Sequence, residues 1–223
     1  MRLALPDAVR PIPLDHPELA IREFAAIMGD LRELPSAAAD LEPIATEAVE
    51  TARREGAFLM AVVTPPDAAP AVLTGVVLDV PPAWDTDTAE SLRDAMEDVG
   101  GPDVRETIAL ETGLGPAVLA QRVPGVEQAR ERRALTVQLQ AFIPEPGSGR
   151  MLLLTLACPS THGWDIHQDL FARLVVSAGP DEDTPVPPTE AAPDEAAKPQ
   201  VERPRRRPAT GEEESFEEHT YQL

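Results

Sequence analysis

Two strand-like runs of residues joined by a short turn constrain the fold of this chain more than any other feature. In the first run, Ala134–Ile143, apolar residues alternate with a largely polar set, the period of two expected of a half-buried strand. The second run, Met151–Ala157, is almost wholly apolar, as expected of a central strand. The intervening PEPGSG cannot continue a ladder and predicts a hairpin loop. The pair favours an antiparallel sheet over a nucleotide-binding α/β fold.

The periodicities in the rest of the chain predict an α+β fold. We expect an antiparallel sheet of about six strands with helices packed on it, which is an α/β/α sandwich. Links of hairpin length between the strands favour antiparallel neighbours over crossover units. The predicted strands are Phe58–Val63, Ala71–Val80, Arg105–Glu111, Ala117–Val123, Ala134–Ile143 and Met151–Ala157. A first helix is predicted to begin near Pro17, and three more cover about Asp40–Glu55, Thr88–Val99 and Gly163–Val176.

Composition divides the chain into three zones. Residues 1–56 are predicted to form an N-terminal helical segment that packs on the domain, and residues 57–179 the α+β sandwich itself. From residue 180 to 223, Pro, Glu, Asp and Ala dominate and apolar periodicity is lost. Such a segment cannot bury enough apolar area to offset its ordering entropy, so we predict a disordered acidic tail.

The formal charge of −20 over 223 residues restricts the partners that the chain can bind. Nucleic acids and anionic membranes need concentrated cationic surface, so neither is an expected partner. No segment approaches the apolar length of a membrane span or of a signal peptide, which predicts a cytoplasmic protein. The single cysteine, Cys158, excludes an intramolecular disulfide.

Thiol, hydroxyl, imidazole and carboxylate groups crowd into the segment Cys158–Asp169, CPSTHGWDIHQD. One interpretation is a nucleophile with a base, or a metal site. However, His162 and His167 are five residues apart, so they miss the spacing that aligns two ligands on one helix face. A strand end, a proline break, a Ser/Thr cap and an amphipathic helix account for every residue, and we favour this structural interpretation. No catalytic, cofactor-binding or metal-binding residue is therefore predicted.

Arginines form the only cationic concentration in the body of the chain. They are Arg122, Arg130, Arg132 and Arg133, which the predicted strand pairing brings to one end of the sheet. One interpretation is a docking site for an acidic peptide, such as the protein's own tail. The other is a solvated loop balanced by Glu127 and Glu131.

Two aromatic residues, Phe216 and Tyr221, lie among acidic residues near the end of the tail. Isolated aromatics in an acidic disordered segment are typical of short linear binding segments. The alternative is a tail that only aids solubility. We include both residues with the four arginines as candidate partner-binding residues.

The run Gly115–Val176 resembles the C-terminal half of the Mog1/PsbP-like family, especially its actinobacterial LpqN-like members. The strand GPAVLAQRVPG, the strands within LTVQLQAFIPEPGSGRMLLLTLACPS and a closing helix match that pattern in order. The resemblance implies a small non-enzymatic α/β/α adaptor, and similar proteins are encoded beside type VII secretion components. A single lysine, Lys198, with many Arg, Ala and Pro residues is also typical of high-GC actinobacterial genomes. The chain departs from the lipoprotein members in lacking a signal peptide and a lipobox cysteine.

These features together predict a cytoplasmic, non-enzymatic binding or accessory protein, an adaptor for a protein partner in an actinobacterial secretion-type system. The alternative is a small-molecule-binding domain or a hydrolase with a site around Cys158–Asp169. A third possibility is a structural protein of a larger assembly, docked through the helix face that carries Leu19, Phe24, Ile27 and Leu31. The sequence leaves the partner's identity and the oligomeric state open.

Overall fold

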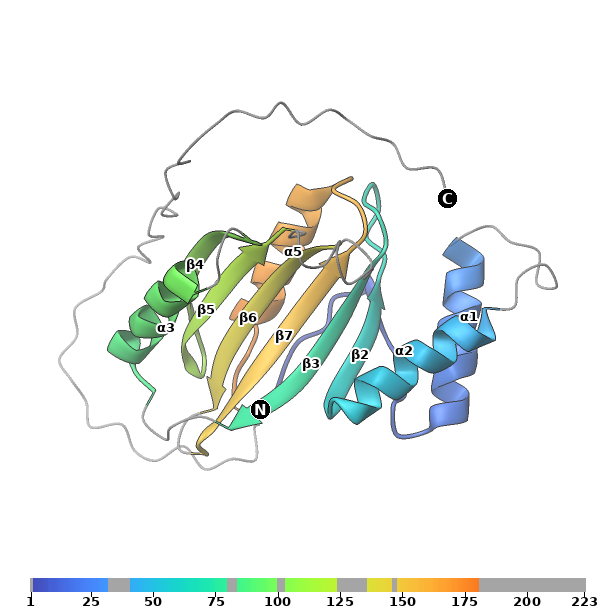
Figure 1. The fold of residues 1–223 in the computed structure, drawn as a ribbon, viewed down its shortest axis with the longest axis horizontal. Helices are drawn as coiled ribbons and strands as arrows, with labels where there is room; N and C mark the ends of the chain where they lie inside the picture. The colour runs from blue at the N-terminus through green and yellow to red at the C-terminus, as the bar shows by residue number, and fades with distance from the viewer. Residues whose placement is uncertain are drawn as a thin grey trace.

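The part of the chain that the structure describes forms one antiparallel sheet of seven strands with helices on both of its faces (Figure 1). A computed structural model describes residues 2–31, 41–79, 84–99, 103–123, 136–145 and 148–180. The strands are β1 (Val9–Pro11), β2 (Ala57–Val63), β3 (Ala71–Asp79), β4 (Val104–Thr112), β5 (Gly115–Arg122), β6 (Val137–Glu145) and β7 (Arg150–Cys158). The helices are α1 (Pro17–Leu31), α2 (Glu42–Arg54), α3 (Thr86–Val99) and α5 (Trp164–Val176).

The predicted α+β fold class is confirmed, and the strand order, which the sequence left open, is β1-β2-β3-β7-β6-β5-β4. Every neighbouring pair is antiparallel. The β6–β7 ladder runs two residues into the predicted PEPGSG loop, because Pro144 lies opposite Met151 and Glu145 opposite Arg150. β7 pairs on its other side with β3, which joins two hairpins that are far apart in the sequence.

Strand β1 is the one element of the sheet that the sequence did not predict. It lies in the segment predicted to be helical and makes the sheet one strand larger than expected. Three residues that include Pro11 carry no readable periodicity. They become a strand because they pair with the edge of β2, where Val9 lies opposite Val63.

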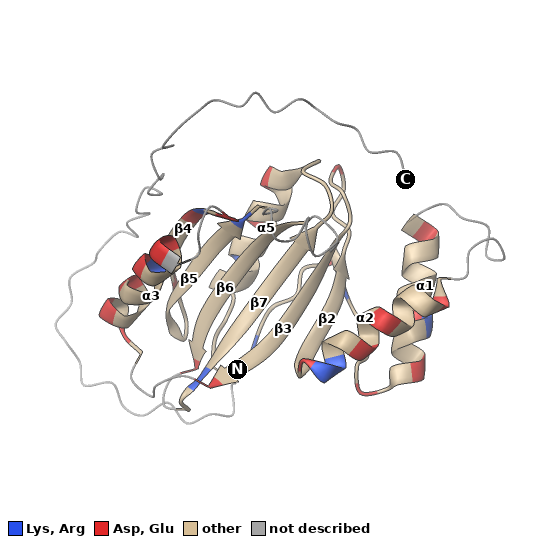
Figure 2. Cartoon of the chain, in the orientation of Figure 1, with Lys and Arg blue, Asp and Glu red and all other residues tan. Residues whose placement is uncertain are grey.

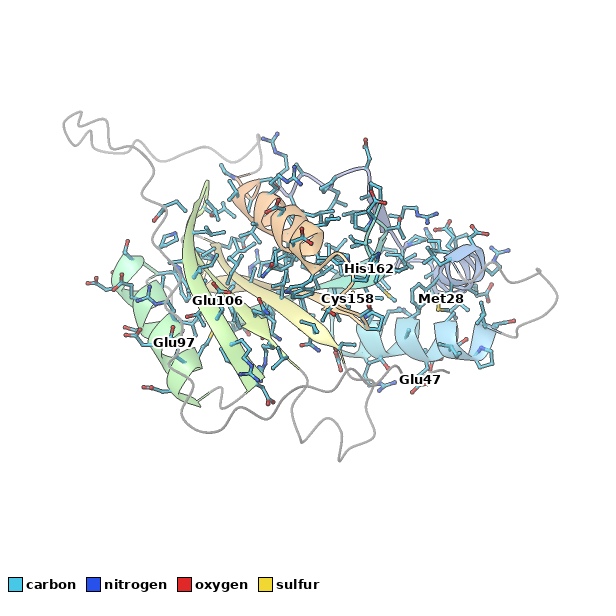
Figure 3. All side chains as sticks on the ribbon, turned by 90° about the horizontal axis from the view of Figure 1, so that it is seen from above. Met28, Glu47, Glu97, Glu106, Cys158 and His162 are labelled. Atoms are coloured by element: carbon cyan, nitrogen blue, oxygen red, sulfur yellow. The ribbon has the colours of Figure 1, made fainter. Side chains whose placement is uncertain are left out.

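One face of the sheet is closed by α5, and we call it the α5 face. Alternate residues of β7 point to it, and Leu152, Leu154 and Leu156 are all buried there. Phe171 and Leu174 of α5 are buried in the same cluster. Seen from above, α5 lies on one side of the sheet and α3 and α2 lie on the other (Figure 3). The main hydrophobic core is therefore the layer between α5 and the sheet.

The helices of the described residues cover the two ends of the opposite face, which we call the α3 face. At one end, α1 and α2 form a second buried cluster with Met60 and Val62 of β2. Phe24 of α1 is buried in this cluster and Ile27 packs against it. Phe24 and Ile27 are therefore not exposed, contrary to the expectation for a docking helix, whereas Leu31 at the end of α1 is exposed.

At the other end of the α3 face, α3 packs on β4 and β5. Its first turn is capped by Asp85, whose carboxylate accepts hydrogen bonds from the hydroxyl and backbone N–H of Thr88 at 2.7 and 2.8 Å. These bonds, chiefly the one from the Thr88 hydroxyl, hold the pKa of Asp85 below its usual value. The Trp84 indole N–H donates to the Pro116 carbonyl at 2.9 Å and ties the helix start to β5.

No helix in the described part of the chain is long and apolar enough to cross a bilayer. Apart from Pro180, the predicted tail of residues 180–223 lies outside the described residues, as does the loop that follows Val123.

The contact between α5 and the sheet predicts where the fold is most sensitive. We expect Phe171→Ala to lower the free energy of unfolding by about 3–5 kcal/mol, because Phe171 is fully buried. The control is Val176→Ala on the same helix, where the side chain is 52% exposed and the expected change is within about 0.5 kcal/mol. Urea denaturation of both variants measures the difference, and equal effects would contradict the assigned core.

Candidate functional site

The middle of the α3 face carries no helix in the described part of the chain. β3, β7 and β6 lie uncovered between α3 and the α1–α2 pair in Figure 1. Most of their side chains on this face are half-buried, whereas Met151 and Pro144, which lie opposite each other at one end of it, are buried. We call this surface the open face, and it consists of Thr74, Val76, Leu78, Arg122, Gln138, Gln140, Phe142, Leu153, Thr155 and Ala157.

The strand register arranges the open face in rows that run across the sheet. An apolar row is formed by Val76, Leu153 and Phe142, which lie opposite one another on β3, β7 and β6. Next to it, Thr74, Thr155 and Gln140 form a polar row. Directly opposed side chains of neighbouring strands lie close enough to act on one ligand together. The open face is therefore a continuous surface with an apolar half and a polar half.

The polar row has unused hydrogen-bonding capacity. Within the described residues, the side chains of Thr74, Thr155 and Gln140 make no hydrogen bond. Each hydroxyl can donate and accept, and the amide offers two donors and an acceptor. Half-buried polar groups of this kind are satisfied by water, and a bound partner can replace that water.

The open face is nearly uncharged, whereas the neighbouring helix α3 is acidic. Arg122 is its single charged residue, at the end of β5 and opposite Gln138 of β6. Figure 2 shows a largely uncharged sheet surface beside the acidic helix α3. The described residues 84–99 carry Asp85, Asp87, Glu90, Asp94, Glu97 and Asp98 against Arg93, whose guanidinium lies 3.6 Å from the Asp94 carboxylate. The acidic helix α3 thus borders the open face at one side.

Of the six candidate partner-binding residues, the structure places Arg122. It lies on the open face, where it adds a half-buried cation to the polar half. Arg130, Arg132, Arg133, Phe216 and Tyr221 lie outside the described residues, and their roles stay predictions. Sequence reasoning missed the open face itself. The alternation of Gln138 and Gln140 with buried residues did indicate that one side of β6 is not core.

The cysteine of the segment 158–169 is a buried residue whose thiol contacts backbone carbonyl oxygens. Cys158 is fully buried, and its thiol donates to the Ser160 carbonyl at 2.9 Å. The Pro70 carbonyl lies 3.7 Å from the same sulfur. Burial raises the pKa of the Cys158 thiol, although the contact with Ser160 acts in the opposite direction. A protonated thiol among carbonyl oxygens lacks the base that nucleophilic catalysis needs.

The buried imidazole of the same segment holds a loop in place. His167 Nε2 lies 2.7 Å from the Ala69 carbonyl, so Nε2 carries a hydrogen and donates it. The backbone N–H of Ala69 in turn donates to the His162 carbonyl at 3.0 Å. These bonds fix the β2–β3 loop to the start of α5, near the labelled residues Cys158 and His162 in Figure 3. The geometry supports the structural interpretation of the segment.

A metal centre has no candidate among the described residues, where no group of three or more His, Cys, Asp or Glu side chains is placed to hold an ion. The described residues form an antiparallel α+β sandwich in which no described helix covers the middle of the α3 face.

Comparisons with known proteins give one distant structural match. No protein-family model matches the sequence, and no curated protein matches it. The structure is similar to the crystal structure of LpqN, a protein involved in cell envelope biogenesis of Mycobacterium tuberculosis. The match covers 79% of each chain at 13% identity, with a TM-score of 0.38. A match of this kind does not place the chain in the Mog1/PsbP-like family.

The close contact between the β2–β3 loop and the start of α5 predicts that substitutions of two glycines differ in their cost to stability. Gly163 and Gly56 have φ of 67° and 73°, where any other residue is strained. A Cβ on Gly163 would lie 2.4 Å from the Ala68 Cβ, whereas a Cβ on Gly56 meets nothing within 4 Å. We expect Gly163→Ala to cost about 1–3 kcal/mol more than Gly56→Ala in thermal or urea unfolding. Equal costs would show that the loop is not held against α5.

The environment of Cys158 predicts an unreactive thiol. At pH 8, we expect its reaction with Ellman's reagent to be about 100-fold slower in the native protein than in urea, because the group is buried and protonated. Absorbance of the released thiolate measures both rates. Equal reaction rates in the native and unfolded protein would contradict this prediction and would favour the interpretation of Cys158 as a nucleophile.

Proposed function

We propose that the protein is a non-enzymatic binding module and that the open face is the surface where a protein partner docks. The observation that carries the proposal is the polar row of Thr74, Thr155 and Gln140, which lacks hydrogen bonds within the described residues and lies beside an apolar row. Interfaces combine an apolar centre with polar groups that become satisfied on binding.

The chemistry of the open face favours binding over catalysis. Active sites bring several titratable groups together in a concave site, where a nucleophile, a base and an electrophile share one substrate. The open face has Arg122 as its single ionisable group, and its other polar groups are hydroxyls and amides. Such residues orient and recognise a partner, and they do not transfer protons at neutral pH.

The acidic composition supports a protein partner rather than a nucleic acid. With a formal charge of −20, the chain repels phosphate backbones and attracts basic proteins. We therefore propose an adaptor or accessory role, with the cytoplasm as its compartment.

A pair of matched variants tests this function. In an affinity capture from lysate of the source organism, we expect full-length protein to retain a partner that Gln140→Arg loses by about tenfold or more. The bulky cation replaces the amide at the β6 end of the polar row, next to Thr155. Val176→Arg adds the same residue at an exposed position of α5, on the other side of the sheet, and should retain the partner.

Quantitative mass spectrometry of the captured proteins gives the readout, and circular dichroism verifies that both variants are folded. A partner retained equally by Gln140→Arg and Val176→Arg would overturn the proposal, because the open face would then not be the docking surface.

A further inference from the structure

A buried imidazole joins the start of α5 to the loop between β2 and β3, residues 64–70. We propose that His167 makes this contact sensitive to pH, so that uptake of a proton by its imidazole releases the loop from α5 and uncovers Cys158. The proposal concerns the α5 face and is independent of the partner surface proposed above. It is carried by the burial of His167 and by the surroundings of its two ring nitrogens.

Burial distinguishes His167 from the other described histidines. His16 and His162 are exposed, whereas His167 is fully buried. Leu170 and Phe171 follow it by three and four residues and belong to the main core, so the imidazole lies on the side of α5 that faces the core. A charge placed there loses its hydration, and only a counter-charge or new hydrogen bonds offset that loss.

The two ring nitrogens of His167 have different surroundings. Nε2 donates its hydrogen to the Ala69 carbonyl at 2.7 Å, which leaves Nδ1 of the neutral ring as an acceptor. Nδ1 is buried and has no hydrogen-bond partner among the described residues. The Trp164 indole lies beside the imidazole, with ring centroids 6.3 Å apart, but its Nε1–H is a donor. Proton uptake therefore gives Nδ1 a hydrogen for which the described residues provide no acceptor.

The titratable groups on the surrounding elements do not supply a counter-charge to His167. They are Asp7 before β1, Asp67 in the loop, Glu106 on β4, Cys158 on β7, His162 just before α5, and Asp165 and Asp169 on α5. The four aspartates are exposed, and the hydrogen bond to Ala69 is the imidazole's single polar contact within the described structure. Glu106 lies opposite Gln121, which accepts a hydrogen bond from Gln168 on the side of α5 away from the loop.

The bond from His167 belongs to a group of contacts that hold the loop at the start of α5, where Figure 3 labels Cys158 and His162. The backbone N–H of Ala69 donates to the His162 carbonyl at 3.0 Å. The Pro70 carbonyl lies 3.7 Å from the Cys158 sulfur. Loss of the bond between Nε2 and Ala69 thus loosens a segment that contacts the Cys158 thiol, and the reactivity of this thiol reports on the position of the loop.

The sign of the pH effect follows from which form of the loop binds the proton. An imidazole that is open to water takes up a proton at about pH 6.5. The closed form offers that proton no partner, so acid favours the open form. Between about pH 7.5 and about pH 5.5, the ratio of open to closed loop then rises about tenfold. Burial raises the pKa of the Cys158 thiol, so the thiol itself stays protonated throughout this range.

The rate at which Cys158 reacts with dithiodipyridine, a thiol reagent that also works in acid, tests the proposal on the full-length protein. His167→Gln is the informative variant, because its amide can still donate to the Ala69 carbonyl but does not titrate. We expect the ratio of the wild-type rate to the His167→Gln rate to rise about tenfold from about pH 7.5 to about pH 5.5. The reagent's own pH dependence cancels in this ratio.

His162→Gln is the matched control, because it removes an exposed imidazole that lies next to the same loop. This variant should keep the wild-type pH profile. The proposal is overturned if wild type and His167→Gln have the same pH profile, or if His162→Gln loses the acid response as completely as His167→Gln does.

Hydrogen exchange of the wild-type protein provides a second test that does not depend on a variant being folded. After correction for intrinsic exchange, we expect protection of the Ala69 amide to fall about tenfold between about pH 7.5 and about pH 5.5. The Ile12 amide, which donates to the Met60 carbonyl away from α5, should change less than about twofold. Unchanged protection of Ala69 would overturn the proposal. An equal loss at Ala69 and Ile12 would also overturn it, because acid would then unfold the whole domain.

Discussion

The pairing of β7 with both β3 and β6 is the interaction on which the rest of the structure depends. Its ladder with β3 runs from Val72 opposite Ala157 to Asp79 opposite Arg150, and β6 pairs along its other edge. Both edges of β7 are thereby satisfied by backbone hydrogen bonds, which makes it a central strand. The same pairing joins the N-terminal hairpin of β2 and β3 to the hairpin of β4 and β5 and so creates one sheet.

One face of β7 is buried under a helix and the other is not covered by the described helices. This difference produces the candidate site. Leu152, Leu154 and Leu156 are buried under α5, where each contributes about 1.5–3 kcal/mol of hydrophobic free energy. Leu153 and Thr155 point to the opposite face, where the described helices stop short of them. The fold is thus stabilised mainly on one side. The open face takes no part in the main core, and we propose it as the surface for a partner.

Much of the architecture could be predicted because its signals are local. The alternation of β6, the PEPGSG turn and the capping region before α3 each depend on neighbouring residues alone. Strand β1 could not be predicted, since three residues containing Pro11 form a strand only through their pairing with β2. For the site, charge clustering identified Arg122, whereas its alignment with Gln138 and the polar row required the strand order.

By itself, the sequence determined the fold class, the bounds of most elements, the acidic charge and the absence of a recognisable catalytic motif. These properties follow from composition and from side-chain periods over a few residues. Only the tertiary structure decided that β7 lies between β3 and β6, that His167 holds Ala69, and that no described helix covers the middle of the α3 face. The physical reason is that adjacency and coverage arise from packing between segments distant in the chain, which no local pattern encodes.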